Sequence, residues 1–175
     1  MAVRMRLVVL GLLAVGLIVG LSACMGFFQN TAQTPTLIIG KPAVSGNRGE
    51  VLISVTNMPN QGLASIQIGK VGNEAITFTN IDASSIKATG LNGFRVLTQD
   101  FATIAGKGCL LAVNPSAGSV GGTIVKITFE VTGANPALGI ADADKGKVDL
   151  GTALNTLIAQ GTWALSSNAA DYYAK

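Results

Sequence analysis

The residues able to do chemistry are few, and their types narrow the options. The chain has no His, which removes Ser-His-Asp and Cys-His catalysis together with the commonest zinc ligand. Its nine acidic residues are scattered, and none sits in a recognisable catalytic motif of the paired kind that glycoside hydrolysis needs. We therefore expect a protein that is not an enzyme.

Asp142, Asp144 and Asp149 lie close together in the sequence and are candidate ligands for calcium. An EF-hand loop beginning at Asp142 would need an oxygen ligand at its fifth position, Gly at its sixth and an acid at its twelfth. Gly146 instead falls at the fifth position, and Ala153 falls at the twelfth. An ordinary acidic turn is favoured, a calcium site of another kind stays open, and no other cofactor is expected.

Cys109 and Trp163 are two further side chains with a possible role. Cys109 lies in the apolar run 108–113 and is interpreted as a buried core residue. Trp163 is the single tryptophan, and an exposed aromatic ring can stack on a sugar. Alternation places Trp163 on the same face as Leu165, which favours the core. A carbohydrate-binding module that uses Trp163 stays open as an alternative function.

The elements that must position these residues are β-strands. The clearest alternation turns Lys126, Thr128 and Glu130 outward, and an earlier strand turns Ser65 and Gln67 outward. Short runs of this kind, separated by turns rich in Gly and Asn, predict an all-β fold, an antiparallel β-sandwich. Strands are expected at 36–39, 50–56, 64–68, 75–78, 94–97, 109–113, 123–132, 137–141, 147–150 and 157–165, and a helical turn at 82–87.

The N-terminal segment differs from the rest. Arg4 and Arg6 precede an uncharged apolar stretch that closes with Leu21-Ser22-Ala23-Cys24, a pattern typical of an export signal. This junction resembles the lipobox of bacterial lipoproteins. The resemblance implies a signal peptide at 1–23, a covalent lipid on Cys24 and a lipoprotein anchored to a membrane outside the cytoplasm, at the cell surface or facing the periplasm.

An uncleaved signal/anchor helix is the alternative for this segment, because its length lies at the lower edge of the roughly 17–25 residues that span a bilayer. Without residues 1–23 the chain keeps ten basic residues against nine acidic ones. It has no Lys/Arg cluster, so no nucleic-acid partner is expected. We expect a tether at 24–35, one domain at 36–165 and a C-terminal tail at 166–175.

Four stretches in order along the domain carry a second resemblance. They are 49–59, GEVLISVTNMP; 62–68, GLASIQI; 121–131, GGTIVKITFEV; and 140–148, IADADKGKV. Together they resemble the cohesin family, the jelly-roll β-sandwich modules of cellulosome scaffolds and cell-surface anchors. Where that family commonly has an aromatic-Asp pair after the second stretch, this chain has Gly69-Lys70-Val71-Gly72-Asn73.

The cohesin resemblance implies a non-enzymatic binding module that docks a dockerin-like protein against one exposed sheet surface. Ser65 and Gln67 are the matching positions on that surface, and Lys126, Thr128 and Glu130 are added to it as further outward residues. A role in an extracellular, polysaccharide-related assembly is compatible with the same module. A structural subunit of a surface assembly is a further alternative, besides the carbohydrate-binding module.

Overall fold

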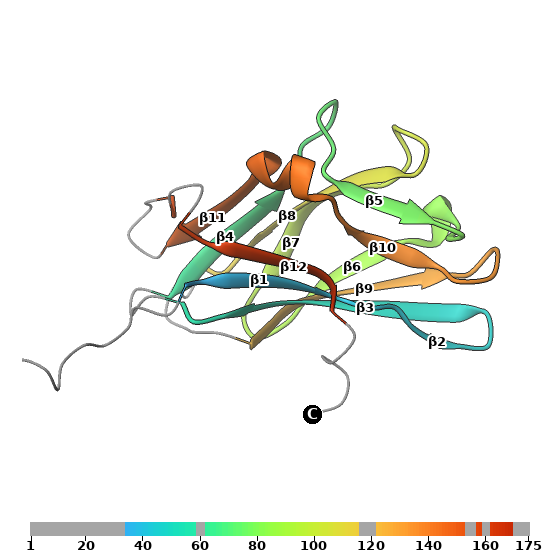
Figure 1. Cartoon of the computed structure of the whole chain (residues 1–175), viewed down its shortest axis with the longest axis horizontal. Coiled ribbons are helices and arrows are strands. Elements are labelled where there is room, and N and C mark those ends of the chain that lie inside the picture. The colour runs from blue at the N-terminus through green and yellow to red at the C-terminus, as the bar shows by residue number, and fades with distance from the viewer. Residues whose placement is uncertain (1–33, 59–61, 116–121, 153–156, 159–161, 170–175) are drawn as a thin grey trace, which may run out of the picture. The chain divides into compact units, whose positions relative to one another are not determined.

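The computed structural model describes residues 34–58, 62–115, 122–152, 157–158 and 162–169. These residues fold into two six-stranded sheets that pack face to face (Figure 1). The first sheet has the order β12-β1-β3-β9-β6, with β2 paired to β3. Its strands are β1 (Thr36–Gly40), β2 (Ala43–Ser45), β3 (Arg48–Thr56), β6 (Lys87–Gly90), β9 (Gly122–Glu130) and β12 (Ala164–Ala169).

The second sheet has the order β10-β5-β8-β4-β11, with β7 paired to β8. Its strands are β4 (Leu63–Ile68), β5 (Ile76–Thr79), β7 (Arg95–Asp100), β8 (Lys107–Val113), β10 (Ala137–Ile140) and β11 (Val148–Thr152). Two 3-10 helices connect strands, η2 (Ala83–Ser85) between β5 and β6 and η3 (Asp142–Lys147) between β10 and β11. The sequence prediction of an all-β sandwich is confirmed.

In the second sheet, two neighbouring strand positions are each occupied by two strands in line, with a gap between them. Both β4 and β5 pair with β8, at Leu110 and at Gly108 respectively, and residues 69–75 separate them. In the same way β11 pairs with β4 and β10 pairs with β5, and η3 separates these two. The segment 69–75 and η3 fill the gaps in these two neighbouring positions, and both lie at the top of the view in Figure 1.

Strand pairing among the described residues is antiparallel with one exception. The closing strand β12 runs parallel to β1, with Thr36 opposite Ala164. It begins later than the sequence suggested, because Leu157 meets β11 only in an isolated bridge to Gly151. The strand predicted at 157–165 is thus wrong in position, and the observed β12 extends to Ala169, into the segment predicted as a tail.

The core consists of the inward residues of both sheets. On β3 these are Val51, Ile53 and Val55, all with no exposed surface, as the alternating sequence predicts. Gly49 precedes them and faces Phe129 of β9. A Cβ atom at Gly49 would lie 2.2 Å from Cε2 of Phe129, so the absence of a side chain there leaves room for the buried ring.

Turn chemistry sets several of the connections. Asn92 and Gly93, between β6 and β7, have positive φ angles of 51° and 87°, the combination that a type I′ turn requires. The amide of Phe94 closes this turn on the carbonyl of Leu91 at 3.0 Å. The expected helical turn near residues 82–87 is present as η2, where the Asp82 side chain accepts from the amide of Ser84.

Candidate docking face

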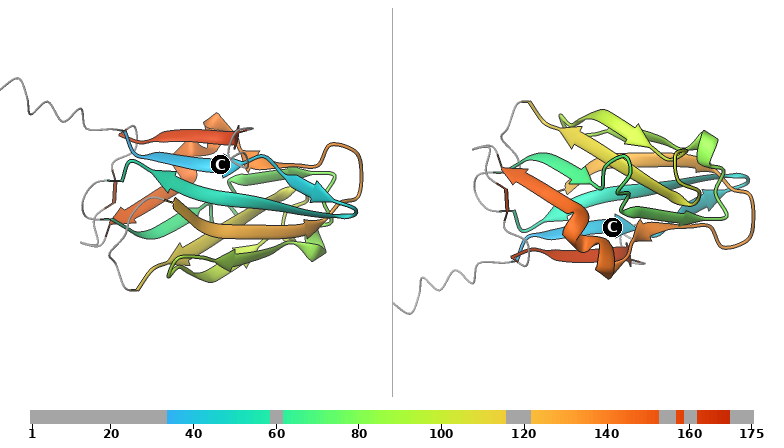
Figure 2. Two further views of the ribbon diagram at one scale, coloured as in Figure 1. Left: turned by 90° about the horizontal axis from the view of Figure 1, so that it is seen from below. Right: turned by 90° about the horizontal axis from the view of Figure 1, so that it is seen from above.

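The outer surface of the second sheet is the first candidate site. Ile66, Leu110 and Leu150 are buried in the core, so the residues that alternate with them point outward. The registers place these outward residues in rows across β11, β4, β8 and β7. We call this surface, seen in the right-hand view of Figure 2, the β4–β8 face. Its members are Asp149, Gly151, Ser65, Gln67, Leu111, Val113, Arg95, Leu97 and Thr98.

Apolar side chains occupy the middle of the β4–β8 face. Leu111 and Val113 lie half-buried on its central strand, β8, with polar residues of β4 and β7 opposite them. Thr98 of β7 stands opposite Leu111, and Leu97 is the extra residue at a register shift between Val96 and Thr98. Leu97 is 61% exposed. The outer face of an antiparallel sheet normally carries polar residues, whereas an apolar centre with a polar rim is typical of protein interfaces.

Ser65 and Gln67 are both on the β4–β8 face and both half-buried. Gln67 stands between Asp149 and Leu111 in the register. Ser65 packs against Gly151, because a Cβ atom built on Gly151 would lie 2.2 Å from the Ser65 Oγ. The sequence prediction that these two residues point outward agrees with the sheet geometry. The hydroxyl of Ser65 packs against β11 at Gly151.

Lys126, Thr128 and Glu130 lie on β9, in the other sheet. The outer surfaces of two sheets packed face to face are on opposite sides of a sandwich. These three residues therefore do not share a surface with Ser65 and Gln67, and the prediction that joined all five is corrected. Alternation within a strand decides which residues point outward, but it does not decide which sheet the strand joins.

The sheet that carries Lys126, Thr128 and Glu130 is seen in the left-hand view of Figure 2, and its outer surface combines charged residues with half-buried Ile38 and Leu52. Glu130 stands opposite Arg48 and Thr128 opposite Glu50, so charges of both signs alternate across the strands. An open groove of about 660 Å³ lies at one end of it. It is lined by residues 43–45, 48–50, 85, 87 and 128–130.

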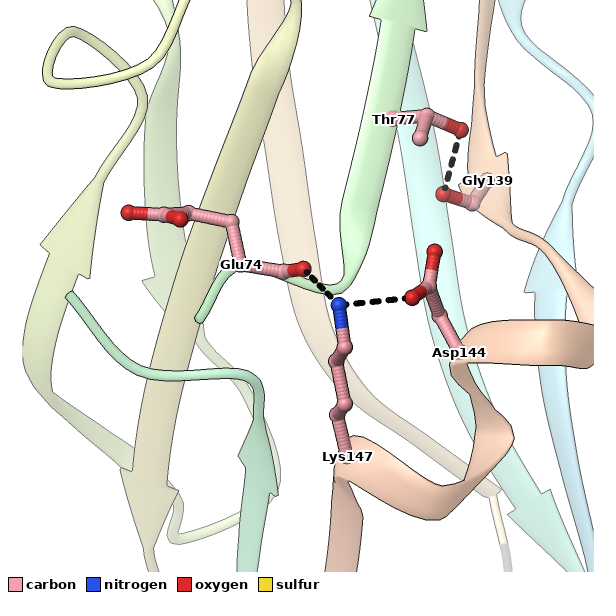
Figure 3. Close-up of polar contacts among 5 residues, drawn as sticks. All are labelled: Glu74, Thr77, Gly139, Asp144 and Lys147. Atoms are coloured by element: carbon pink, nitrogen blue, oxygen red, sulfur yellow. Dashed lines mark hydrogen bonds and ion pairs between the residues drawn. The ribbon is translucent and has the colours of Figure 1, made fainter. Parts of the chain in front are cut away.

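Lys147 links η3 to the segment 69–75 by two polar contacts, which we call the lysine staple (Figure 3). Lys147 Nζ lies 2.7 Å from the Asp144 carboxylate and donates to the carbonyl oxygen of Glu74 at 3.2 Å. The Lys147 carbonyl in turn accepts from the amide of Gly69 at 2.9 Å. Through these bonds η3 and the segment 69–75 hold each other in place beside the β4–β8 face.

The three carboxylates of the calcium hypothesis do not converge. Asp144 is paired with Lys147, Asp142 is exposed on η3, and Asp149 lies on the β4–β8 face opposite Gln67. No group of three or more His, Cys, Asp or Glu side chains with the geometry to hold a metal occurs in the part of the chain that the structure describes. Asp142 and Asp144 lie in an acidic 3-10 turn with an internal ion pair, and Asp149 lies apart from them on β11.

Trp163 is buried, with 1% of its surface exposed. Lys145 from η3 covers it, with Nζ 4.7 Å from the centre of the indole ring and 2.6 Å from the Trp163 carbonyl oxygen. A ring that stacks on a sugar needs an open face, so the burial of Trp163 removes the residue on which the carbohydrate-binding alternative rested. The interpretation of this side chain as part of the core is confirmed.

Cys109 is buried and is a free thiol, as expected. Burial raises the pKa of its thiol, and the negative charges of Asp100 and Glu74 add to that effect. Asp100 itself accepts hydrogen bonds from the Thr103 hydroxyl and from the amides of Ala102 and Thr103. These bonds hold the pKa of the Asp100 carboxyl below its usual range. Both perturbations have a structural cause, and neither produces a reactive group.

The predicted signal peptide, Cys24 and most of the tether lie outside the described residues. Tyr172 and Tyr173 of the predicted tail lie outside them as well. Within the described ranges no helix has the length and apolarity needed to cross a membrane. The lipid on Cys24 stays a prediction from sequence.

The fold of this chain is cohesin-like. No protein-family model and no curated protein matches its sequence. The sixth cohesin of Acetivibrio cellulolyticus scaffoldin B, solved in complex with a mutant Cel5 dockerin, matches with a TM-score of 0.53 at 12% identity, over 79% of this chain and 98% of that one.

Two other solved structures share the fold. The OlpA cohesin of Clostridium thermocellum, solved with the dockerin Doc918, matches with a TM-score of 0.53 at 15% identity, over 78% of this chain and 96% of that one. A non-cellulosomal cohesin of the archaeon Archaeoglobus fulgidus matches with a TM-score of 0.50 at 14% identity, over 81% of this chain and 95% of that one.

The apolar centre of the β4–β8 face was missed from sequence, although β8 carries a signal for it. Its residues 109–113 are all apolar, without the alternation of polar residues seen in β9. A continuous apolar run means that both sides of a strand are apolar. With Leu110 and Ala112 in the core, Leu111 and Val113 must face outward.

Proposed function

We propose that this chain is a lipid-anchored, non-enzymatic docking module of cohesin type, which binds a dockerin-like protein on an extracytoplasmic membrane surface. One observation carries the choice of face. The β4–β8 face sets exposed Leu97 and half-buried Leu111 and Val113 among polar residues, whereas the opposite surface combines half-buried Ile38 and Leu52 with charges of both signs. Two of the solved structures with this fold were determined with a bound dockerin, which supports a protein partner.

The partner is expected to meet the β4–β8 face as a flat surface. Its centre offers apolar contact, and Ser65, Gln67 and Thr98 offer hydrogen bonds around it. Arg95 and Asp149 lie at opposite corners, on β7 and β11, and would orient a partner that carries charges of both signs. The tip of the hairpin Lys70–Asn73 stands in the place of the family's aromatic-Asp pair, so the partner is expected to differ from those of cellulosomal cohesins.

Leu97→Asp tests the docking face. The full chain in detergent micelles would be titrated with dockerin-like modules from its own genome, with the Cel5 dockerin and Doc918 as reference probes. Burying the new carboxylate against an apolar part of the partner should cost about 2 kcal/mol or more, so this change should weaken the dissociation constant by about 30-fold. Because Leu97 is 61% exposed, the substitution leaves the fold intact.

Val44→Asp is the matched control, since Val44 is 46% exposed on β2 of the other sheet. It should leave binding unchanged. Equal loss in both variants, or loss with Val44→Asp alone, would place the interface elsewhere. Failure of every dockerin-like module to bind would refute the dockerin-like partner.

The anchor is tested separately by Cys24→Ser. A diacyl or triacyl anchor holds a protein firmly on a membrane, whereas a single chain binds marginally. The substitution should therefore release the protein from membranes that otherwise require detergent to give it up. Retention of the Cys24→Ser variant would instead favour the uncleaved N-terminal helix.

A further inference from the structure

Two connections flank the central strand β8 at Cys109, where the β4–β8 face ends. On one side β4 leaves β8 at Leu110 and β5 joins it at Gly108, so the segment 69–75 lies beside Cys109. On the other side β7 ends opposite Cys109, and the connection 101–106 leads back into β8. Both connections rise at the top of the view in Figure 1, away from the first sheet. We call 69–75 the first rim loop and 101–106 the second rim loop.

The rim loops cover the outer side of β8 at Cys109. By alternation Cys109 points outward, as Leu111 and Val113 do. Those two side chains are half-buried, whereas Cys109 is 2% exposed. Burial raises the pKa of its thiol, and the carboxylates of Asp100 and Glu74, at the bases of the two loops, add to that effect. The β4–β8 face therefore ends against a raised edge that both loops form.

The first rim loop presents an exposed apolar side chain on a fixed backbone. Val71 is 58% exposed and is the second residue of a type II turn. The amide of Asn73 donates to the carbonyl of Lys70 at 2.8 Å, and Gly72 has the positive φ, 81°, that this turn requires. The carboxylate of buried Glu74 accepts from the amide of Gly72 at 2.8 Å, and the lysine staple holds the base of the loop.

The second rim loop presents Ile104 in a similar way. Ile104 is 38% exposed. The Asp100 carboxylate accepts from the amides of Ala102 and Thr103 at 2.9 and 3.0 Å. The amide of Lys107 then donates to the carbonyl of Ile104 at 3.0 Å. Both tips are thus shaped before any partner arrives, which lowers the entropy that binding would cost.

Exposed apolar residues gather around these loops. Three of the large apolar side chains that are exposed in the described chain belong to the rim loops or to the adjoining β7; they are Val71, Ile104 and Leu97. Such a gathering marks a surface that another molecule covers. The tip residues 70–73 and 101–106 carry a single charge, exposed Lys70. A complementary partner therefore offers apolar contact and a negative charge.

We propose that Val71, Ile104 and Lys70 select the partner of the β4–β8 face. The partner lies on the sheet against Leu97 and abuts the raised edge. There it meets Val71 and Ile104 with an apolar surface, and it places a carboxylate beside Lys70. This inference rests on the proposed docking function, and it identifies the partner as a protein whose contact surface is apolar with an acidic border.

Val71→Ser and Ile104→Ser test the apolar contacts. The full chain in detergent micelles would be titrated with the same dockerin-like modules and the same two reference dockerins as the Leu97→Asp variant. Each substitution should weaken the dissociation constant by about tenfold. Both side chains are exposed, so the fold is kept. Val44→Ser, which changes an exposed valine of the other sheet, is the matched control and should bind like the parent.

Lys70→Glu tests the acidic border. Binding should weaken severalfold at low ionic strength, and the loss should shrink in high salt, which screens exposed charges. Lys41→Glu changes an exposed lysine between β1 and β2 and should have no effect. Equal or tighter binding by Lys70→Glu would overturn the acidic border.

The outcomes separate this inference from the docking function. Loss of binding with Leu97→Asp, but not with Val71→Ser or Ile104→Ser, would leave the docking face in place and overturn the role of the rim loops. Failure of every module to bind would refute both. Self-association of the chain that Val71→Ser and Ile104→Ser abolish would assign the rim loops to a second copy, and would also overturn the proposal.

Discussion

The lysine staple gives the sharpest test of how this sandwich is held together. Lys147→Met keeps the length of the aliphatic stem and removes the ammonium group. It therefore breaks both the 2.7 Å contact to Asp144 and the 3.2 Å hydrogen bond to the carbonyl of Glu74. Glu74 is 3% exposed, so water has little access to replace the lost donor.

The size of the effect follows from the two contacts. The side chains of Lys147 and Asp144 are 30% and 18% exposed, and a pair of this kind contributes about 0.5–1 kcal/mol. A hydrogen bond from a charged group contributes about 1.5 kcal/mol at the lower end of its range, which suits a bond of 3.2 Å. Lys147→Met should therefore lower the free energy of unfolding by about 2 kcal/mol, or the melting temperature by about 4–8 °C.

Denaturant unfolding followed by the fluorescence of Trp163, the single tryptophan, measures this loss. Asp144→Asn removes only the ion pair and should cost about 0.5 kcal/mol. Lys126→Met, on the outer surface of the other sheet, is the control and should stay within about 0.5 kcal/mol of the parent. If Asp144→Asn proved as costly as Lys147→Met, the carbonyl bond would contribute nothing and the argument would fail.

Three further predictions concern single residues outside the β4–β8 face. Hydrogen bonds from Thr103 and Ala102 lower the pKa of Asp100 in the folded protein. The charged carboxylate therefore stabilises the fold at a pH above the pKa that Asp100 has in the unfolded chain. This stabilisation is lost as the pH falls through the lower pKa of the folded state. Asp100→Asn should therefore be less stable than the parent at neutral pH, with a gap that narrows below about pH 4; a gap that stayed constant down to about pH 2 would refute this linkage. Trp163→Ala should lower the free energy of unfolding by about 3–5 kcal/mol because the ring is buried, and an intact fold with lost polysaccharide retention would contradict that expectation. Cys109 should react with a disulfide reagent only after unfolding, since burial raises the pKa of its thiol; rapid reaction in the native chain would show that the thiol is accessible.

Much of the fold is visible in the sequence because local alternation specifies it. The outward and inward residues of β9 and β4 follow from a period of two, which the pleat of a strand imposes. Turn residues such as Asn92-Gly93 mark where strands end, because few residues tolerate their positive φ angles. Features without a local pattern were missed, among them the short strand β2 and the shift of β12 to Ala164–Ala169.

The candidate site shows a sharper division. The sequence indicates that Ser65, Gln67, Lys126, Thr128 and Glu130 point outward, but it places them on one surface, and the structure divides them between two. The hairpin-like connection that separates β4 from β5, and the staple from Lys147 that supports it, join residues far apart in the chain. Such contacts leave no trace in a local pattern.

The sequence by itself determined the class of fold, an all-β sandwich, and it predicts an N-terminal export signal with a lipid on Cys24. Periodicity, turn residues and the order of basic, apolar and small residues are local properties, and each is complete within a few neighbours. Only the tertiary structure decided which strands share a sheet. That pairing sets Thr98 of β7 opposite Leu111 of β8 and buries Trp163 beneath Lys145, because strand pairing depends on contacts between distant segments.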